Sequence, residues 1–414
     1  MSGHRERTAA TTEPPPCGLG AVADDLADAA LFLARRFTAG ATMWCCSPPW
    51  PHHARHVTVE YVHPVIVGKQ ALPAVAVVDR DPVTAVTVAA RPGDVLLAVS
   101  PARDVVVSEM MRQAPEWGLG TVWVGSGDRP AAGAADHVLW LDASLDSGSG
   151  DGDAPFDGRF ILLYHVLWEL TQVCLEHAGL LRPRPGRDSI AATDEPTGFL
   201  YPFLDAGEDD VGALLGDLAR SADAKADESG RLLAVTLDAC ADVLEATASA
   251  VAERLGAGGR LFTFGNGGSS TDAAGLGALF THPPRGRPLP ARSLAADEAV
   301  LTALSNDIGF EVVFSRQLIA HARAGDVAVG ISTSGTSANL LAAFAEARRR
   351  GVLTVGFAGY DGGAMAQCPD LDHLLVVRSQ SIHRVQEVQS AIGHRLWSRA
   401  QTVLNGVEQE VAVG

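Results

Sequence analysis

Short apolar runs, often rich in β-branched residues, alternate with longer stretches of helical periodicity in both halves of the chain. In the second half the apolar runs predict strands at residues 260–265, 292–296, 327–332, 352–358 and 373–378. The stretches around them predict helices at 229–256, 270–281, 298–304, 310–322, 337–350 and 382–404. This alternation is typical of a parallel sheet with helices on both faces. The sequence therefore predicts an α/β protein whose ligands bind at the carboxyl ends of strands.

The two halves of the chain carry related segments in the same order. Gly-Asp-Val at 325–327 opens an apolar strand that ends before Ser332, and Gly-Asp-Val at 93–95 opens one that ends before Ser100. The two copies are separated by the length of a whole domain, which indicates duplicated domains rather than the short repeats of a solenoid. We expect two three-layer αβα domains with parallel sheets, fused as a pseudo-dimer.

Composition sets the domain boundaries and excludes some partners. A length of 414 residues with 47% hydrophobic side chains suits two domains. The formal charge of −17 argues against nucleic acid or an anionic membrane as partner. No signal peptide, membrane span or Cys-x-x-Cys pair is found, so we expect a cytoplasmic protein with idle thiols. The predicted units are a disordered tail at 1–17, domains at 18–181 and 229–405, a linker at 182–228, a tail at 406–414, and a surface loop at 147–153.

Two loops of the second domain have the composition of a phosphate site. The first follows a predicted strand, opens a predicted helix and is rich in hydroxyls: Ser332, Thr333, Ser334, Gly335, Thr336 and Ser337. Hydroxyls and the free N–H groups of a helix N-terminus both donate hydrogen bonds to an anion. The second loop is rich in glycine and follows another strand: Asn266, Gly267, Gly268 and Ser269. Neither is a nucleotide-binding motif. In the first domain, Pro48-Pro49-Trp50-Pro51 and Pro101 replace the corresponding loops, so no phosphate is expected there.

The second domain resembles the sugar isomerase (SIS) domain family, and most of all its phosphoheptose isomerases. The resemblance rests on ordered motifs: Gly265-Asn-Gly-Gly-Ser269, Asn306-Asp307-x-Gly-Phe310, Gly330-Ile-Ser-Thr-Ser-Gly335, Asp361-Gly-Gly363 and Arg384-Val-Gln-Glu387. It covers residues 229–405 strongly and 18–180 weakly. It implies a parallel α/β fold and isomerisation of a phosphorylated sugar, with sedoheptulose 7-phosphate the first candidate.

The resemblance also implies that the catalytic residues are divided between the two domains. Phosphoheptose isomerases carry His-x-x-x-Glu after the glycine loop and a Gln and a His eight residues apart on the last helix. The second domain keeps the latter as Gln386 and His394 but has Gly275 and Leu279 in place of the former. The first domain has His56-Val-Thr-Val-Glu60, which a one-residue loop deletion would bring into register. A composite site between the domains is therefore expected.

The resemblance assigns a role to each of these residues. Glu60 is the expected general base, and His394 is its acid/base partner. The serine-rich and glycine loops bind the substrate phosphate, while Asn306, Asp307 and Gln386 bind the rest of the substrate. A divalent metal, plausibly zinc, is expected on His56, Glu60, Gln386 and His394. A homodimer of the fused chain would reproduce a four-domain assembly.

Several alternatives stay open from the sequence. His56 and Glu60 could form a surface pair on a first domain that is only a structural partner. The pair His165 and Glu169 occupies the place of the Gln/His helix in the first domain; it could add a ligand, but it is interpreted as a helix-surface pair. No role is assigned to His52 or His53. The protein could be a non-catalytic regulator or assembly protein that binds a sugar phosphate. Some relatives are lyases or etherases, although no residue here singles out that chemistry.

Overall fold

The structure, a computed structural model, describes residues 19–66, 68–141, 155–177 and 211–413. The predicted N-terminal tail, the 147–153 loop and residues 182–210 of the predicted linker lie outside the described residues. Among the described helices, none is long and apolar enough to cross a membrane.

The first domain is a three-layer αβα unit with one parallel sheet in the order β2-β1-β3-β4-β5. Its strands are β1 (Met43–Cys46), β2 (Ala74–Val77), β3 (Val95–Val99), β4 (Gly120–Ser126) and β5 (His137–Leu141). Its helices are α1 (Ala21–Thr38), α2 (Pro51–Val62), α3 (Pro82–Ala89), α4 (Val105–Gln113) and α5 (Arg159–Glu176). Pro51 is the first residue of α2, the helical position that needs no backbone donor.

The second domain repeats this topology, with the parallel sheet order β7-β6-β8-β9-β10. Its strands are β6 (Leu261–Gly265), β7 (Ala291–Ser293), β8 (Val327–Ile331), β9 (Leu353–Gly359) and β10 (His373–Val377). Its helices are α9 (Ala241–Gly256), α10 (Gly268–Thr281), α11 (Glu298–Asp307), α12 (Val313–His321), α13 (Ala338–Arg349) and α14 (Ile382–Val413), with short 3₁₀ turns η2 (Phe310–Val312) and η3 (Gly363–Gln367). The predicted α/β class and the two parallel sheets are confirmed.

The repeated Gly-Asp-Val segments have the same structural task in both domains. Asp94 accepts hydrogen bonds from the backbone N–H groups of Thr42 and Arg91, at 2.8 and 2.9 Å. Asp326 accepts the equivalent bonds from Arg260 and Arg323, both at 2.8 Å. Each carboxylate thus satisfies one donor in the turn before its own strand and one donor just before the neighbouring strand, where an unpaired N–H would destabilise the fold. The repeat reflects this shared architecture.

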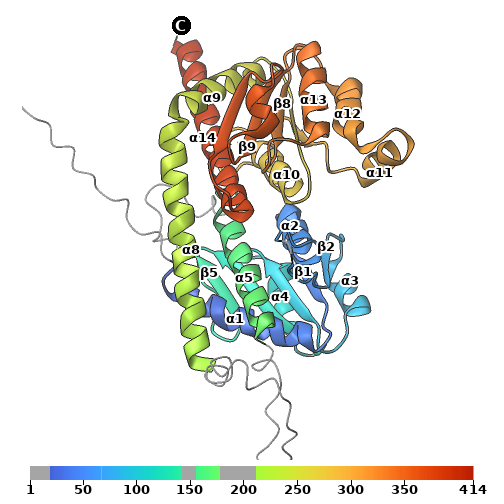
Figure 1. The fold of residues 1–414 in the computed structure, drawn as a ribbon, viewed down its shortest axis with the longest axis vertical. Coiled ribbons are helices and arrows are strands. Elements are labelled where there is room, and N and C mark those ends of the chain that lie inside the picture. The colour runs from blue at the N-terminus through green and yellow to red at the C-terminus, as the bar shows by residue number, and fades with distance from the viewer. Residues whose placement is uncertain (1–18, 67, 142–154, 178–210, 414) are drawn as a thin grey trace, which may run out of the picture.

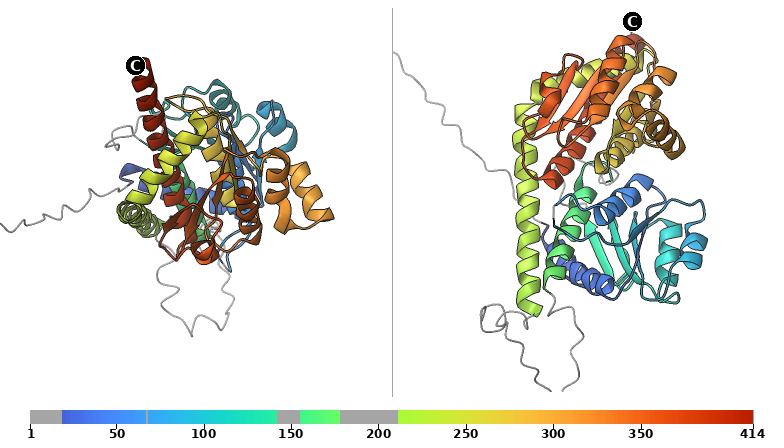
Figure 2. Two further views of the ribbon diagram at one scale, coloured as in Figure 1. Left: turned by 90° about the horizontal axis from the view of Figure 1, so that it is seen from above. Right: turned by 45° about the vertical axis from the view of Figure 1, so that its right-hand side comes forward.

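One long helix, α8 (Val211–Ala239), runs beside both domains, as Figures 1 and 2 show. Its residues 211–228 fall inside the predicted linker, and α14 continues to Val413 where a tail was predicted. Leu218, Ala222 and Ala226 of α8 are buried against the first domain. Their spacing of four residues puts them on one helix face, which explains why this stretch folds as a helix. The domains also meet directly, α2 packing on α10 and α5 on α14.

Candidate active site between the domains

His56 and Glu60 lie at the interface between the domains and are almost completely buried. Their exposed fractions are 1% and 2%. His56 Nδ1 lies 3.2 Å from a carboxylate oxygen of Asp272 on α10 of the second domain, and His56 Nε2 lies 3.7 Å from Glu60 Oε1. The pair is therefore not a surface pair, and its i, i+4 spacing directs both groups at the other domain.

His165 of α5 joins the same cluster, so its interpretation as part of a helix-surface pair is wrong. The side chain is 0% exposed, with Nδ1 3.1 Å from Glu387 Oε1 and Nε2 3.3 Å from His56 Nε2. The sequence did hold a signal for it. His165-Val-Leu-Trp168 matches His394-Arg-Leu-Trp397, so His165 is the first domain's counterpart of His394.

Glu169, the other member of that pair, is enclosed by positive charge. His383 Nδ1 lies 2.6 Å from Glu169 Oε1, and the Arg384 guanidinium donates to the same oxygen at 2.9 Å. Lys225 of α8 contacts the second carboxylate oxygen. The other ring nitrogen of His383, Nε2, lies 3.2 Å from Glu60 Oε2. His383 thus joins Glu60 and Glu169, two carboxylates of the first domain, to a helix of the second.

Burial and neighbouring charges shift the pKa values of these groups in opposite directions. Burial would lower the pKa of His383, but Glu169 and Glu60 outweigh it and raise that pKa to about 9. Burial also opposes the charged form of His56, yet Asp272 and Glu60 raise its pKa above 6.5. The pKa of His165 falls well below 6.5 because of burial and the nearby cationic rings. Burial raises the pKa of Glu387 to about 7.

The geometry around His56 and His165 fits a metal ion. Each imidazole places Nδ1 beside a carboxylate, and the two Nε2 atoms face one another. A carboxylate partner on Nδ1 fixes the tautomer that leaves Nε2 able to bind a metal. The ligand atoms of His56, Glu60 and His165 all lie within 4.8 Å of one another. Two imidazoles and one carboxylate are the ligand set of many catalytic zinc sites, which keep a further position for substrate.

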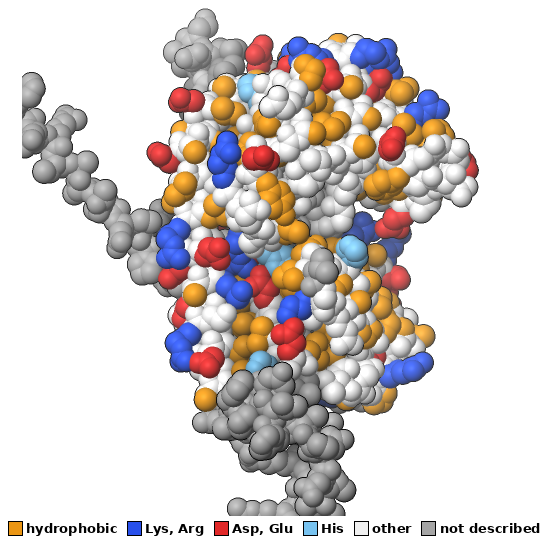
Figure 3. All heavy atoms as spheres, viewed as in Figure 1, with side chains coloured by type: hydrophobic (Ala, Val, Ile, Leu, Met, Phe, Trp, Pro, Cys, Tyr) orange, Lys and Arg blue, Asp and Glu red, His pale blue; other side chains and the backbone are white. Residues whose placement is uncertain are grey.

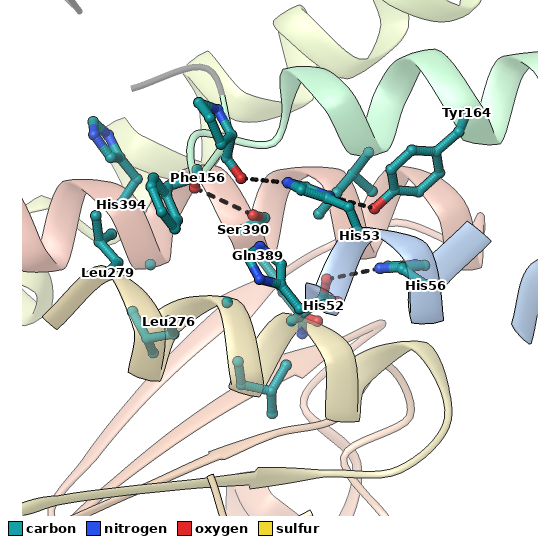
Figure 4. A pocket seen from close by; sticks show the side chains of 16 residues that line it. His52, His53, His56, Phe156, Tyr164, Leu276, Leu279, Gln389, Ser390 and His394 are labelled. Atoms are coloured by element: carbon teal, nitrogen blue, oxygen red, sulfur yellow. Dashed lines mark hydrogen bonds and ion pairs between the residues drawn. The ribbon is translucent and has the colours of Figure 1, made fainter. Parts of the chain in front are cut away.

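His394 lies at a different place from this trio. It lines a cavity of about 20 Å³ between the domains, together with His52 and Leu279. Figure 4 shows it at the opposite end of that cavity from His56. Eight residues of helix separate it from Gln386, a rise of about 12 Å. Of the four predicted ligands, the structure therefore brings His56, Glu60 and Gln386 together and leaves His394 apart.

The glycine loop of the second domain touches the histidine cluster of the first. A Cβ atom placed on Gly268 would lie 3.2 Å from both Glu60 Oε1 and His56 Nε2, and 2.2 Å from Gln386 Nε2. A side chain at residue 268 would displace the Gln386 amide and press on His56 and Glu60, so glycine favours this close approach of loop to cluster. Beside it, Asn266 and Asn339 exchange side-chain hydrogen bonds of 3.0 and 2.9 Å, which tie the glycine loop to helix α13.

The serine-rich loop gathers its hydroxyls around one turn. Ser334 and Thr336 hydroxyls lie 3.0 Å apart, and Ser332 Oγ lies 3.5 Å from both Ser334 and Ser337. Ser332 also accepts the Gly335 N–H at 3.0 Å. Gly335 has a φ of +65°, which a side chain would strain. The loop precedes α13, so hydroxyls and helix N-terminus converge as an anion site requires.

The remaining predicted substrate contacts divide between buried and exposed positions. Gln386 is 3% exposed and stands beside Gly268 and Asp272. Asn306 and Asp307 are exposed at the end of α11, where the Asn306 amide donates to the Asp307 carboxylate at 2.8 Å.

Comparison with known proteins decides the family. A model of the SIS domain matches residues 226–359. The phosphoheptose isomerase of Paramagnetospirillum magneticum is 42% identical over 178 residues, which are 42% of this chain and 92% of that protein. The chain belongs to the SIS domain family. The phosphoheptose isomerase of Desulfovibrio desulfuricans is 48% identical over 159 residues, covering 38% of this chain and 74% of that protein.

One solved structure has the same fold across both domains. The C-terminal domain of glucosamine-fructose-6-phosphate aminotransferase from Francisella tularensis aligns with 96% of this chain and 98% of its own, with a TM-score of 0.55. Its 9% identity makes this a likeness of fold alone. The arrangement of two fused αβα domains thus also occurs in that solved structure.

Proposed function

We propose that this SIS protein is an aldose–ketose isomerase of a phosphorylated sugar, with sedoheptulose 7-phosphate as first candidate and one composite site per chain. One observation carries the proposal. The buried His56–Glu60 pair of the first domain lies against Gly268 and Gln386 of the second. The relatives that share the second domain's sequence are named phosphoheptose isomerases, which supports this class of reaction.

The residues divide the chemistry as follows. The hydroxyls of Ser334 and Thr336, with the N-terminus of α13, hold the phosphate of the substrate. Glu60 removes a proton from C1 of the ketose and returns it to C2, while a proton moves from the C1 oxygen to the C2 oxygen. Closure of the two domains around the cluster excludes water from the reacting carbons. His394 stays the proposed acid/base partner, although it lies at the far end of the cavity.

A divalent metal, for which zinc is the candidate, would be held by His56, Glu60 and His165 and would polarise the sugar oxygens. Asp272 and Glu387 orient the two imidazoles. We expect His165→Ala to weaken zinc binding at least tenfold by titration calorimetry, whereas His394→Ala leaves the affinity unchanged. Equal losses in both variants would return His394 to the ligand set and refute this assignment.

Proton exchange tests the activity directly. Wild-type protein with sedoheptulose 7-phosphate in deuterated water should lose the C1 proton signal by NMR. Glu60→Gln should abolish exchange because an amide cannot accept the proton, while phosphate binding survives. The matched control is Ser334→Ala with Thr336→Ala, which should lose binding but keep the metal. If wild type binds ketose and aldose phosphates without exchange, the isomerase proposal fails.

A non-catalytic regulator is the second candidate, and one observation favours it. The cavity between the domains, about 20 Å³, holds no more than about one water molecule, and Glu60 is already engaged by His383. A sugar phosphate would have to open this interface. Binding without exchange would identify this function. We further propose that the chain arose by internal duplication and that the protein is a cytoplasmic homodimer. Analytical sedimentation would test the dimer by measuring the mass of the protein in solution.

A further inference from the structure

A second cavity lies on the seam between the domains, beside the connecting helix. We call it the seam cavity. It measures about 400 Å³. Its walls come from α5, α8, the start of α14 and the segment that follows α2. The lining residues include Lys69, Trp168, Glu169, Gln172, Lys225 and His383. This volume suits a small metabolite, whereas the cavity at the histidine cluster does not. It shares no lining residue with the serine-rich or glycine loop.

The charges that face the seam cavity are mostly positive. Lys69, Lys225 and His383 line it, and Glu169 is the one acidic residue among the described lining residues. Arg384 stands directly behind His383 and also bonds to Glu169. A chain with a formal charge of −17 thus turns a cationic pocket to solvent at this point. Figure 3 shows Lys and Arg side chains gathered with acidic ones along the seam beside α8.

Both lysines can turn to a ligand at little cost. Lys69 contacts Glu176, whose side chain is 59% exposed, and exposed ion pairs contribute little stability. Lys225 shares Glu169 with the Arg384 guanidinium, which bonds to the other carboxylate oxygen. The Lys225 ammonium can therefore leave Glu169 without leaving that carboxylate unpaired. Trp168 and Ile66 add an apolar wall against which the body of a metabolite would pack.

We propose that the seam cavity binds a small phosphate-bearing metabolite, whose phosphoryl oxygens are held by Lys69 and Lys225. Two ammonium groups reaching one cavity from different elements suit a doubly charged phosphoryl group. His383 forms a wall of the cavity and also bonds to Glu60, so the ligand would lie one side chain away from the proposed catalytic base. That regulatory consequence rests on the proposed isomerase function, whereas binding in the cavity does not.

Phosphate binding in a defined background tests the site. The full chain carrying Ser334→Ala and Thr336→Ala is titrated with inorganic phosphate by calorimetry at low ionic strength. One phosphate should bind per chain in this background. Adding Lys69→Gln should weaken that binding about tenfold, and adding Lys225→Gln as well should remove it. Because the serine-rich loop is already disabled, failure of the proposed isomerase site cannot produce this pattern.

Two controls keep the result interpretable. Arg220→Gln removes a cation from the same helix α8, where Arg220 pairs with Asp217 at an exposed position, and should leave phosphate binding unchanged. Thermal unfolding of Lys69→Gln should match wild type, since its ion pair is exposed. Unchanged binding after both lysine substitutions would overturn the proposal. So would a loss in Arg220→Gln as large as in Lys69→Gln, because that pattern indicates general charge rather than a site.

Discussion

Gly335→Ala is the sharpest test of the serine-rich loop as the phosphate site. Gly335 has a φ of +65°, and a Cβ atom there would lie 2.2 Å from the carbonyl oxygen of Gly362. The left-handed conformation costs about 1–2 kcal/mol for a residue with a side chain. Overlap with a packed backbone adds about 1–3 kcal/mol. Alanine also lowers the conformational entropy of the unfolded chain, which offsets about 0.4–1 kcal/mol of this destabilisation. The net loss should be about 2–4 kcal/mol.

Gly325→Ala at the opposite end of β8 separates conformational strain from overlap. Gly325 has a φ of +95°, but a Cβ there would meet no atom within 4 Å. It should cost only about 1 kcal/mol. For a domain of this size each kcal/mol lowers Tm by about 2–4 °C, so calorimetry should show a much larger drop for Gly335→Ala. Phosphate affinity should fall at least tenfold in Gly335→Ala only. Equal Tm values and unchanged affinity would refute the loop geometry described here.

Three further changes probe the interface and its charges. Gly268→Ala should slow C1 proton exchange and weaken zinc binding because its Cβ would enter the histidine cluster, whereas Gly393→Ala, with its nearest neighbour at 3.5 Å, should do neither. Glu169→Gln should lower the urea midpoint of unfolding at neutral pH, because it removes the carboxylate shared by three cations. The pKa of Glu169 is lowered to about 2, so the difference in midpoint between wild type and variant should shrink as the pH falls below 4 and wild type begins to protonate this carboxylate. The pKa of buried His53 lies well below 6.5, so the unfolded chain binds more protons and stability should fall from pH 7 to pH 5. His53→Gln should flatten that fall, and an equally steep fall in the variant would contradict the assignment.

The strands and the positions of the serine-rich and glycine loops could be predicted from the sequence because their signals are local. Each residue of β8 is buried, so the strand is a continuous apolar run, and the hydroxyl-rich turn follows it directly. The predicted helix at 229–256 covers the last part of α8 and all of α9, which the structure separates at Cys240. The first part of α8 was assigned to a linker because acidic residues and glycines near its start are typical of linkers. Its small residues become buried only when it packs on the first domain, which no local pattern reveals.

The histidine cluster shows the other limit of sequence reasoning. The pair His56 and Glu60 was found because four-residue spacing is visible in one helix. Asp272 and Glu387, the partners of the two imidazoles, were missed because they lie more than 200 residues away along the chain. Only the packing of α2 on α10 and α5 on α14 brings these groups together. The repeated His-x-Leu-Trp places His165 opposite His394, but the sequence alone does not show that His165 is buried, so the pair with Glu169 was interpreted as a surface pair.

Fusion of the two domains through α8 removes a constraint that acts on identical subunits. In a homodimer with twofold symmetry every substitution occurs twice, so a residue that suits one partner must also suit the other. Here the two halves are different segments of one chain, so a change in one is not copied in the other. Gly275 faces His52 of the first domain, although the related position of that domain is His56. Such a chain can lose one of two equivalent sites without losing both, and the vacated half is open to selection for other ligands.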